Sequence, residues 1–259
     1  MRDSSKTAAD IVDVRLVDDF LDAIADDLKL LAVLHESEID ALGFAQLKDL
    51  EFPKTLSLNL SGEKAKCAQS LMADVIRALP SEPDEALLDE LAVDFADIYL
   101  TYRLRAAPTE SVWLDKDHLI RQQPMFQVRA AYRLRGLKVA DWRKHSEDHL
   151  VTQIQFLAHL FGECRDEKAL QEAATFLDNH LLKWIDMFAE KVAQRSRTPF
   201  YGALARLTAS YLDELRQVLS EFVGVPRPKI KEVSKECLDE ELEALKVVPV
   251  NSPPTGPGW

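Results

Sequence analysis

The 259-residue chain is long enough to bury a sizeable core, and its 8 glycines favour long helices over many short strands. Its formal net charge of −12 disfavours a nucleic-acid partner, because such binding depends on neutralising phosphates with lysine and arginine. The odd set Cys67, Cys164 and Cys237 indicates free thiols, and the absence of a long apolar run or signal peptide predicts a cytoplasmic protein without membrane insertion.

Helical periodicity dominates the first part of the chain. Apolar residues recur at helical spacing over residues 11–35, and a shorter helix is expected within 37–50. Residues 55–60 alternate like a strand, but a lone strand has no pairing partner, so we predict an extended connector. Further helices are predicted over 62–79, which a proline ends, and over 84–102.

The middle of the chain contains two short polar segments between helices. Pro108 breaks the helical pattern, so the Glu-Ser-Val-Trp segment after it is a loop or a helix entrance. A helix over 116–135 is expected to end at a glycine. Ser146 is a suitable N-cap for the next helix, whose first turn would then hold Glu147 and Asp148.

The last helices carry the clearest pattern. One continuous apolar stripe covers residues 170–192, and Thr198-Pro199 starts a second that continues to Phe222. Beyond Gly224 lie six of the chain's 12 prolines, which predicts a mobile tail with one short helix around 234–245.

These patterns predict an all-α protein. We expect one bundle-like helical domain over residues 1–224 and a Pro-rich tail over 225–259. A hinge near 105–116 would allow two protomers to exchange halves, so the oligomeric state stays open between monomer and dimer.

Metal and cofactor sites are not predicted. His145 and His149 are four residues apart, but a zinc site needs three or four convergent ligands, and no histidine has the Glu-x-x-His spacing of a di-iron bundle. The sequence also lacks a phosphate-binding loop. We therefore expect no bound cofactor.

An enzymatic function is the least favoured interpretation of the sequence. Ser111 lacks the flanking glycines of a nucleophile elbow, although His149 could serve as a base in a small helical hydrolase or nucleotide-binding enzyme. Ordinary structural roles also account for these residues. Glu147 and Asp148 suit the first turn of any helix, and Trp113 suits a packing anchor.

Three blocks in order carry a resemblance to a known family. They are Asp94-Phe95-Ala-Asp-Ile-Tyr99-Leu, Pro108-Thr-Glu-Ser-Val-Trp-Leu-Asp115 and Glu147-Asp-His-Leu150. Together they resemble the TorD/DmsD family over roughly residues 15–222. This resemblance implies an all-helical cytoplasmic chaperone, not an enzyme. Such a chaperone binds the twin-arginine leader of the catalytic subunit of a molybdenum-cofactor oxidoreductase, delays its export and aids cofactor insertion.

The resemblance also implies the peptide-binding residues. Matched by position, Trp113, Asp148 and His149 are the main candidates for leader contact, followed by Glu110, Ser111 and Glu147. Carboxylates suit the leader because they pair with guanidinium groups in a planar, often bidentate way, and an indole can cover an apolar segment or stack on an arginine.

Two departures from the family pattern concern the same site. The last block lacks the proline that usually precedes Glu-Asp-His, since Ser146 stands before Glu147, and Gln153 stands where many relatives have glutamate. A NarJ-like assembly chaperone for a molybdoenzyme subunit that is not exported therefore stays open as the alternative, since it would bind an N-terminal tail without twin arginines.

Overall fold

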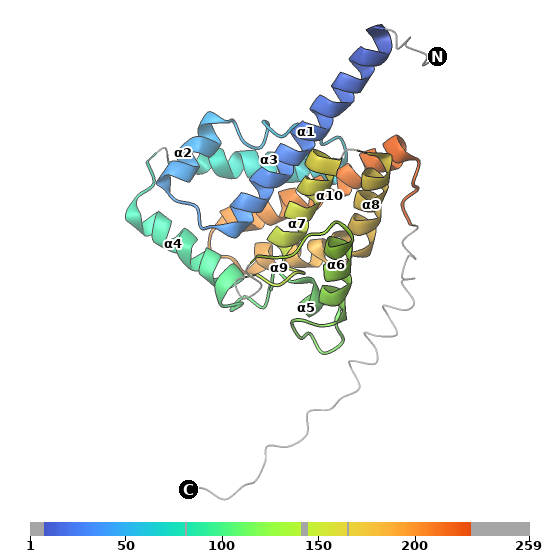
Figure 1. Ribbon diagram of the computed structural model, residues 1–259. Coiled ribbons are helices and arrows are strands. Elements are labelled where there is room, and N and C mark those ends of the chain that lie inside the picture. Colours follow the sequence, from blue (N-terminus) through green and yellow to red (C-terminus); the bar gives the residue numbers. More distant parts are fainter. Residues whose placement is uncertain (1–7, 81, 141–144, 165, 229–259) are drawn as a thin grey trace, which may run out of the picture. The chain divides into compact units, whose positions relative to one another are not determined.

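The computed structural model describes residues 8–80, 82–140, 145–164 and 166–228 (Figure 1). The chain divides into two units after Arg227, and every helix of the described residues lies in the first. That unit is all-α, as predicted, and within the described ranges the only β-type pairing is one isolated bridge. No helix in these ranges is both long enough and apolar enough to cross a membrane.

The first half of the unit confirms the helices expected from periodicity. Asp40 and Asp84 cap two of them, because each carboxylate accepts a hydrogen bond from a backbone N–H three residues later. The elements are α1 (Ala8–Glu36), α2 (Ala41–Asp49), α3 (Glu63–Ala78), α4 (Glu85–Phe95) and the π-helical turn η1 (Ala96–Leu100).

The second half begins with short helices and ends with the longest buried one. Its elements are α5 (Glu110–Leu114), α6 (Gln123–Leu134), α7 (Leu150–His159), the π-turn η2 (Leu160–Cys164), α8 (Glu167–Asn179), the 3-10 turn η3 (Leu181–Lys183), α9 (Ile185–Arg195) and α10 (Pro199–Val223). Pro199 starts α10, as the sequence predicts, and Gly224 ends it in a left-handed conformation.

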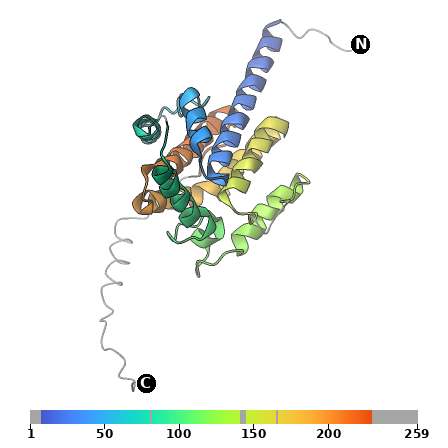
Figure 2. The same ribbon diagram turned by 90° about the vertical axis from the view of Figure 1, so that its left-hand side faces the viewer.

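The core forms around α10. Helices α3, α8 and α9 all pack against α10, while α1 packs against α7, and Figures 1 and 2 show these last two side by side. Apolar and aromatic side chains fill the space between them, and the largest fully buried aromatic residues are Phe44, Phe161, Trp184, Phe188, Phe200, Tyr201 and Tyr211. Burial of such side chains stabilises the fold by about 1.5–3 kcal/mol each.

The connector over residues 55–60 has no strand partner, as predicted, but it is not a solvated loop. Leu56, Leu58 and Leu60 are all buried. The carboxylate of Asp27 on α1 accepts hydrogen bonds from the backbone N–H groups of Ser57 and Leu58, at 2.7 and 3.2 Å. The connector therefore covers the core as a fixed, extended segment.

Two helix boundaries differ from the prediction. Helix α6 begins at Gln123, not at residue 116, because His118 and Arg121 have left-handed backbone conformations that no helix can contain. Pro124 in its first turn is the sequence signal that marks this start. Tyr102, expected to extend the previous helix into the core, lies beyond η1 and is exposed.

Two further corrections concern helix starts and continuity. The N-cap of α7 is His149, not Ser146, so Glu147 and Asp148 precede the helix instead of occupying its first turn. The stripe over 170–192 is not one helix either. The backbone at His180 leaves helical geometry, with φ −125° and ψ −92°, and separates α8 from α9.

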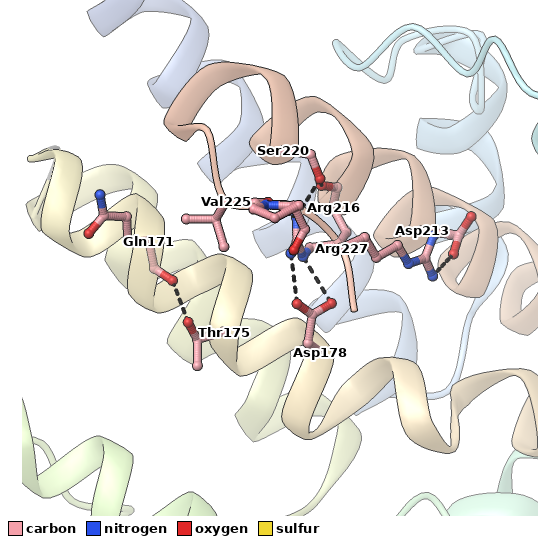
Figure 3. Close-up of polar contacts among 9 residues, drawn as sticks. Gln171, Thr175, Asp178, Asp213, Arg216, Ser220, Val225 and Arg227 are labelled. Atoms are coloured by element: carbon pink, nitrogen blue, oxygen red, sulfur yellow. Dashed lines mark hydrogen bonds and ion pairs between the residues drawn. The ribbon is translucent and has the colours of Figure 1, made fainter. Parts of the chain in front are cut away.

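A buried arginine fixes the chain after α10 (Figure 3). Arg216 is fully buried and forms two parallel hydrogen bonds to Asp178 of α8, at 2.9 and 2.7 Å. Its Nη1 also donates to the Val225 carbonyl, and Arg227 pairs with Asp213. Contacts of the helical unit thus continue past the predicted boundary at residue 224. The short helix expected around 234–245 lies outside the described residues.

Candidate functional site

The last two of the three sequence blocks of the resemblance, Pro108–Asp115 and Glu147–Leu150, lie against each other in the structure. The N–H of Glu110 donates to the Asp148 carbonyl at 3.0 Å, and the N–H of Leu150 donates to the Pro108 carbonyl at 2.8 Å. These bonds form the isolated antiparallel bridge. The start of α5 is therefore fixed to the start of α7.

The Asp148 carboxylate joins the same two segments through its side chain. It is fully buried, and Oδ2 accepts from both the N–H and the hydroxyl of Ser111, at 2.9 and 2.5 Å. Oδ1 accepts from the hydroxyl of Ser146 at 2.7 Å. Both carboxylate oxygens thus bind donors of the protein itself.

Glu110 is the second buried carboxylate. Its Oε2 accepts from the Gln153 amide at 2.9 Å, and its Oε1 lies 2.9 Å from Nδ1 of His180. All three side chains are buried. These groups and those around Asp148 form the buried carboxylate cluster: Glu110, Ser111, Ser146, Asp148, Gln153 and His180.

His149 acts as the cap of α7. Its Nδ1 accepts a hydrogen bond from the Val151 N–H at 3.2 Å, and its ring centroid lies 4.3 Å from that of His145. Burial, with a smaller contribution from the His145 imidazole, holds the pKa of His149 well below its ordinary value. The ring is therefore neutral near pH 7. The described residues contain no group of three or more metal-ligating side chains.

Glu147 lies at the edge of the cluster and fastens α6 to it. Its carboxylate pairs with Arg129 at 2.7 Å, and its backbone carbonyl accepts from the hydroxyl of Tyr132 at 2.9 Å. Burial acts to raise the pKa of Glu147, but the hydrogen bond from Arg129, a backbone hydrogen bond and the positive charges of Arg129 and Arg121 together outweigh it and leave that pKa below its usual value. Glu147 is therefore charged and already paired.

Trp113 is one turn after Glu110 on α5 and borders a hollow of about 660 Å³. Its indole N–H donates to the Ala107 carbonyl at 2.8 Å, which leaves the ring half-buried. We call this space the Trp113 hollow, and its lining residues are Tyr102, Arg105, Ala107, Val112, Trp113, His118, Ile120 and Lys191.

Strained backbone shapes this hollow. Among described non-glycine residues with positive φ, four fall in one stretch of twenty: Tyr102, Arg105, His118 and Arg121, with φ of 53°, 51°, 53° and 60°. The first three of them line the hollow. Such conformations each cost on the order of 1 kcal/mol and persist where the surrounding structure enforces them, often at ligand sites.

The hollow is apolar with a basic edge. Arg105, His118 and Lys191 line it, and no carboxylate among the described residues does. Four apolar side chains nearby on α5, α6 and the intervening loop are also exposed to solvent: Leu114, Leu119, Ile120 and Phe126. An exposed apolar surface of this kind, next to a shaped hollow, is typical of a peptide-binding site.

The structure thus divides the predicted site residues. Trp113 borders the open hollow, whereas Glu110, Ser111, Asp148 and His149 are buried and do not line it. Sequence reasoning missed His180, for which no local signal exists. It noticed Gln153 only as a departure, and the structure explains that departure, since the amide donates to Glu110 where a glutamate would bring a second negative charge.

Comparison with known proteins assigns the family. The sequence model of the nitrate reductase delta subunit family matches residues 61–190. The chaperone protein TorD of a Vibrio cholerae serotype O1 strain is 34% identical over 159 residues, which are 58% of this chain and 71% of that protein. TorD of Vibrio parahaemolyticus is 29% identical over 157 residues, covering 58% and 72% of the two chains.

A third relative is TorD of Shewanella oneidensis, which is 30% identical over 147 residues, covering 54% of this chain and 65% of its own. The relatives are chaperones, which excludes the hydrolase interpretation and defines this chain as a chaperone and not an enzyme. It belongs to the TorD family, which the three sequence blocks indicated.

Proposed function

We propose that this chaperone matures a molybdoenzyme in the cytoplasm, by binding the twin-arginine leader of the catalytic subunit and delaying export until the cofactor is inserted. Family membership supports the general role. The observation that carries leader binding is the Trp113 hollow, an apolar space of about 660 Å³ bordered by a half-buried indole and exposed apolar side chains.

We assign the apolar stretch of the leader to this hollow. Its walls offer Tyr102, Val112, Trp113 and Ile120 to aliphatic side chains. Its charged lining residues are all basic or imidazole groups, so guanidinium groups would be repelled there. The twin arginines would therefore lie outside the hollow, where the net charge of −12 still favours the encounter.

In this proposal the buried carboxylate cluster positions Trp113 and does not contact the leader. Asp148, Glu110 and Ser111 hold the start of α5, and His149 holds the start of α7, so together they set where Trp113 lies. A leader arginine could pair with Asp148 only by displacing Ser111 or Ser146. Glu147 is more accessible, but a guanidinium group would have to compete with Arg129 for it.

Calorimetric titration tests the proposal. The ligands are a synthetic twin-arginine leader, the same peptide with both arginines replaced by lysine, and a peptide whose apolar stretch is replaced by serine and glycine. We expect micromolar binding, of about −8 kcal/mol, that the serine–glycine peptide loses and the lysine peptide largely keeps. No binding by the first two peptides would overturn it.

A NarJ-like chaperone for a subunit that is not exported is the second candidate. It is favoured by the match to the nitrate reductase delta subunit family. Such a protein would bind an N-terminal tail without twin arginines. Titration with the N-terminal peptides of molybdoenzyme subunits with and without twin arginines separates the two. If the tails without twin arginines bind more tightly, the ligand is such a tail and not a twin-arginine leader, and the NarJ-like function replaces our proposal.

A further inference from the structure

Two positive charges at the edge of the Trp113 hollow have no counter-charge among the described residues. Arg105, in the turn after η1, and Lys191 of α9 both line the hollow. Neither side chain forms an ion pair or a hydrogen bond with any residue that the structure describes. The chain has 44 acidic and 32 basic residues, so acidic partners are not scarce in it. Both charges are therefore open to a ligand.

A second hollow, lined by residues of α3, α9 and α10, has the opposite arrangement. Lys64 pairs with Asp186 at 2.7 Å, and Arg206 pairs with Glu190 at 3.4 Å. All four side chains line that hollow, so each basic group there has a carboxylate beside it. The Trp113 hollow can instead receive an acidic group without displacing a carboxylate of the protein itself.

The turn that carries Arg105 is fixed to the helix that carries Lys191. Nη1 of Arg195, one turn after Lys191 on α9, donates to the Leu104 carbonyl at 2.7 Å. The Leu104 N–H donates to the Asp97 carbonyl of η1 at 3.3 Å. The backbone positions of both basic residues are thus set before a ligand binds, which lowers the cost of ordering them.

The surface beside these charges is apolar. Tyr102, Val112 and Trp113 line the same hollow and offer contacts to aliphatic side chains. A guanidinium group binds a carboxylate in a planar way, and an ammonium group attracts it as a point charge. A small inorganic anion would gain nothing from the apolar walls, while a purely apolar segment would leave both charges unpaired. The combination favours an apolar segment with an acidic side chain beside it.

We propose that the leader bound in the Trp113 hollow carries an aspartate or glutamate next to its apolar stretch, and that this carboxylate pairs with Arg105 and Lys191. The inference rests on the proposed function, because it adds a requirement for the peptide that binds there. Arg105 and Lys191 then determine which leaders the chaperone binds most tightly.

Calorimetric titration of the full chain with three peptides tests this requirement. All three contain twin arginines and the same apolar stretch. One has glutamine on both sides of that stretch, one has glutamate before it, and one has glutamate after it. One glutamate peptide binds about three- to tenfold more tightly than the glutamine peptide at low salt, as expected for partly exposed ion pairs. The net charge of −12 acts against both glutamate peptides, so a preference for either must come from nearby basic groups.

Variants locate the preference. Arg105→Gln and Lys191→Gln each weaken it, and the double variant abolishes it. Lys183→Gln removes an exposed lysine of η3 that does not line the hollow, and keeps the preference. If neither glutamate peptide binds more tightly than the glutamine peptide, or if the double variant keeps the preference, the inference is overturned while leader binding stands. If none of the three peptides binds, the proposed function fails and the inference fails with it.

Discussion

The carboxylate of Asp148 accepts both the backbone N–H and the hydroxyl of Ser111, at 2.9 and 2.5 Å, across 37 residues of sequence. This contact joins the start of α5, the helix that carries Trp113, to the segment before α7. The residues that the resemblance implies for peptide contact therefore fall into two groups in the described conformation, one bordering the hollow and one holding it in place.

Asp148→Asn is expected to destabilise the protein strongly. The amide keeps the shape but places an N–H₂ group where donors already converge, and the hydrogen bonds to a charged acceptor are lost. We expect the free energy of unfolding to fall by about 2–3 kcal/mol, measured by urea denaturation.

A matched control for this prediction lies in the loop before α6. Asp117→Asn changes an exposed carboxylate, whose side chain is 63% accessible, and should alter stability by no more than about 0.5 kcal/mol. Equal stability of the two variants would mean that Asp148 does not hold α5 in place.

Trp113→Ala should separate binding from folding. Loss of the indole removes a wall of the Trp113 hollow, so leader affinity should fall by about 2 kcal/mol, roughly 30-fold. Trp113→Phe keeps an aromatic wall but loses the hydrogen bond to Ala107, and should retain most of the affinity. Calorimetric titration of the three proteins measures both effects. Similar affinity of wild type and Trp113→Ala would place the leader elsewhere.

His35 makes stability depend on pH. Burial lowers the pKa of His35 to about 3, while an unfolded histidine titrates near 6.5. Between these values the unfolded chain binds a proton that the folded chain does not, so stability decreases as the pH falls below about 6.5. The loss due to this residue is about 2–3 kcal/mol at a pH of about 4.5. Burial of His149 acts in the same direction.

The variant His35→Gln tests whether His35 causes this pH dependence, through the slope of the free energy of unfolding against pH. The variant loses hydrogen bonds to Tyr99 and Thr208, so its stability is lower near pH 7. Below a pH of about 6 the free energy of unfolding should nevertheless change less steeply, by about 1.4 kcal/mol per pH unit. Urea unfolding at several pH values gives both slopes, and identical slopes would exclude His35 as their source.

For the buried Arg216–Asp178 pair we expect the single variant to be less stable than the double variant. Arg216→Met leaves the mostly buried carboxylate of Asp178 without its partner and should cost about 3–5 kcal/mol. Replacing both residues, by Met and Leu, should recover most of that loss, because no buried charge remains. Chemical denaturation of the single and double variants measures the recovery.

The neighbouring pair provides the comparison. Arg227 and Asp213 are partly exposed, so Arg227→Met should cost less than about 1 kcal/mol. A loss for Arg216→Met as small as that for Arg227→Met would show that the buried pair does not fix the end of α10.

Local patterns predicted most helices because each depends on residues near one another in sequence. The apolar stripe of α3, the Thr198-Pro199 start of α10 and its end at Gly224 are all signals of this kind. The wrongly predicted helix boundaries also have local causes. The backbone leaves helical geometry at His118, Arg121 and His180, although the apolar residues on either side keep helical spacing.

The sequence by itself determined the all-α class, the order of most helices and the three blocks that indicate the family. Only the tertiary structure decided that Glu110 and Asp148 are buried and that Trp113 borders the hollow. The partners of Glu110 are 43 and 70 residues away, at Gln153 and His180. Whether a carboxylate faces solvent or an internal donor depends on such distant partners, and periodicity contains no information about them.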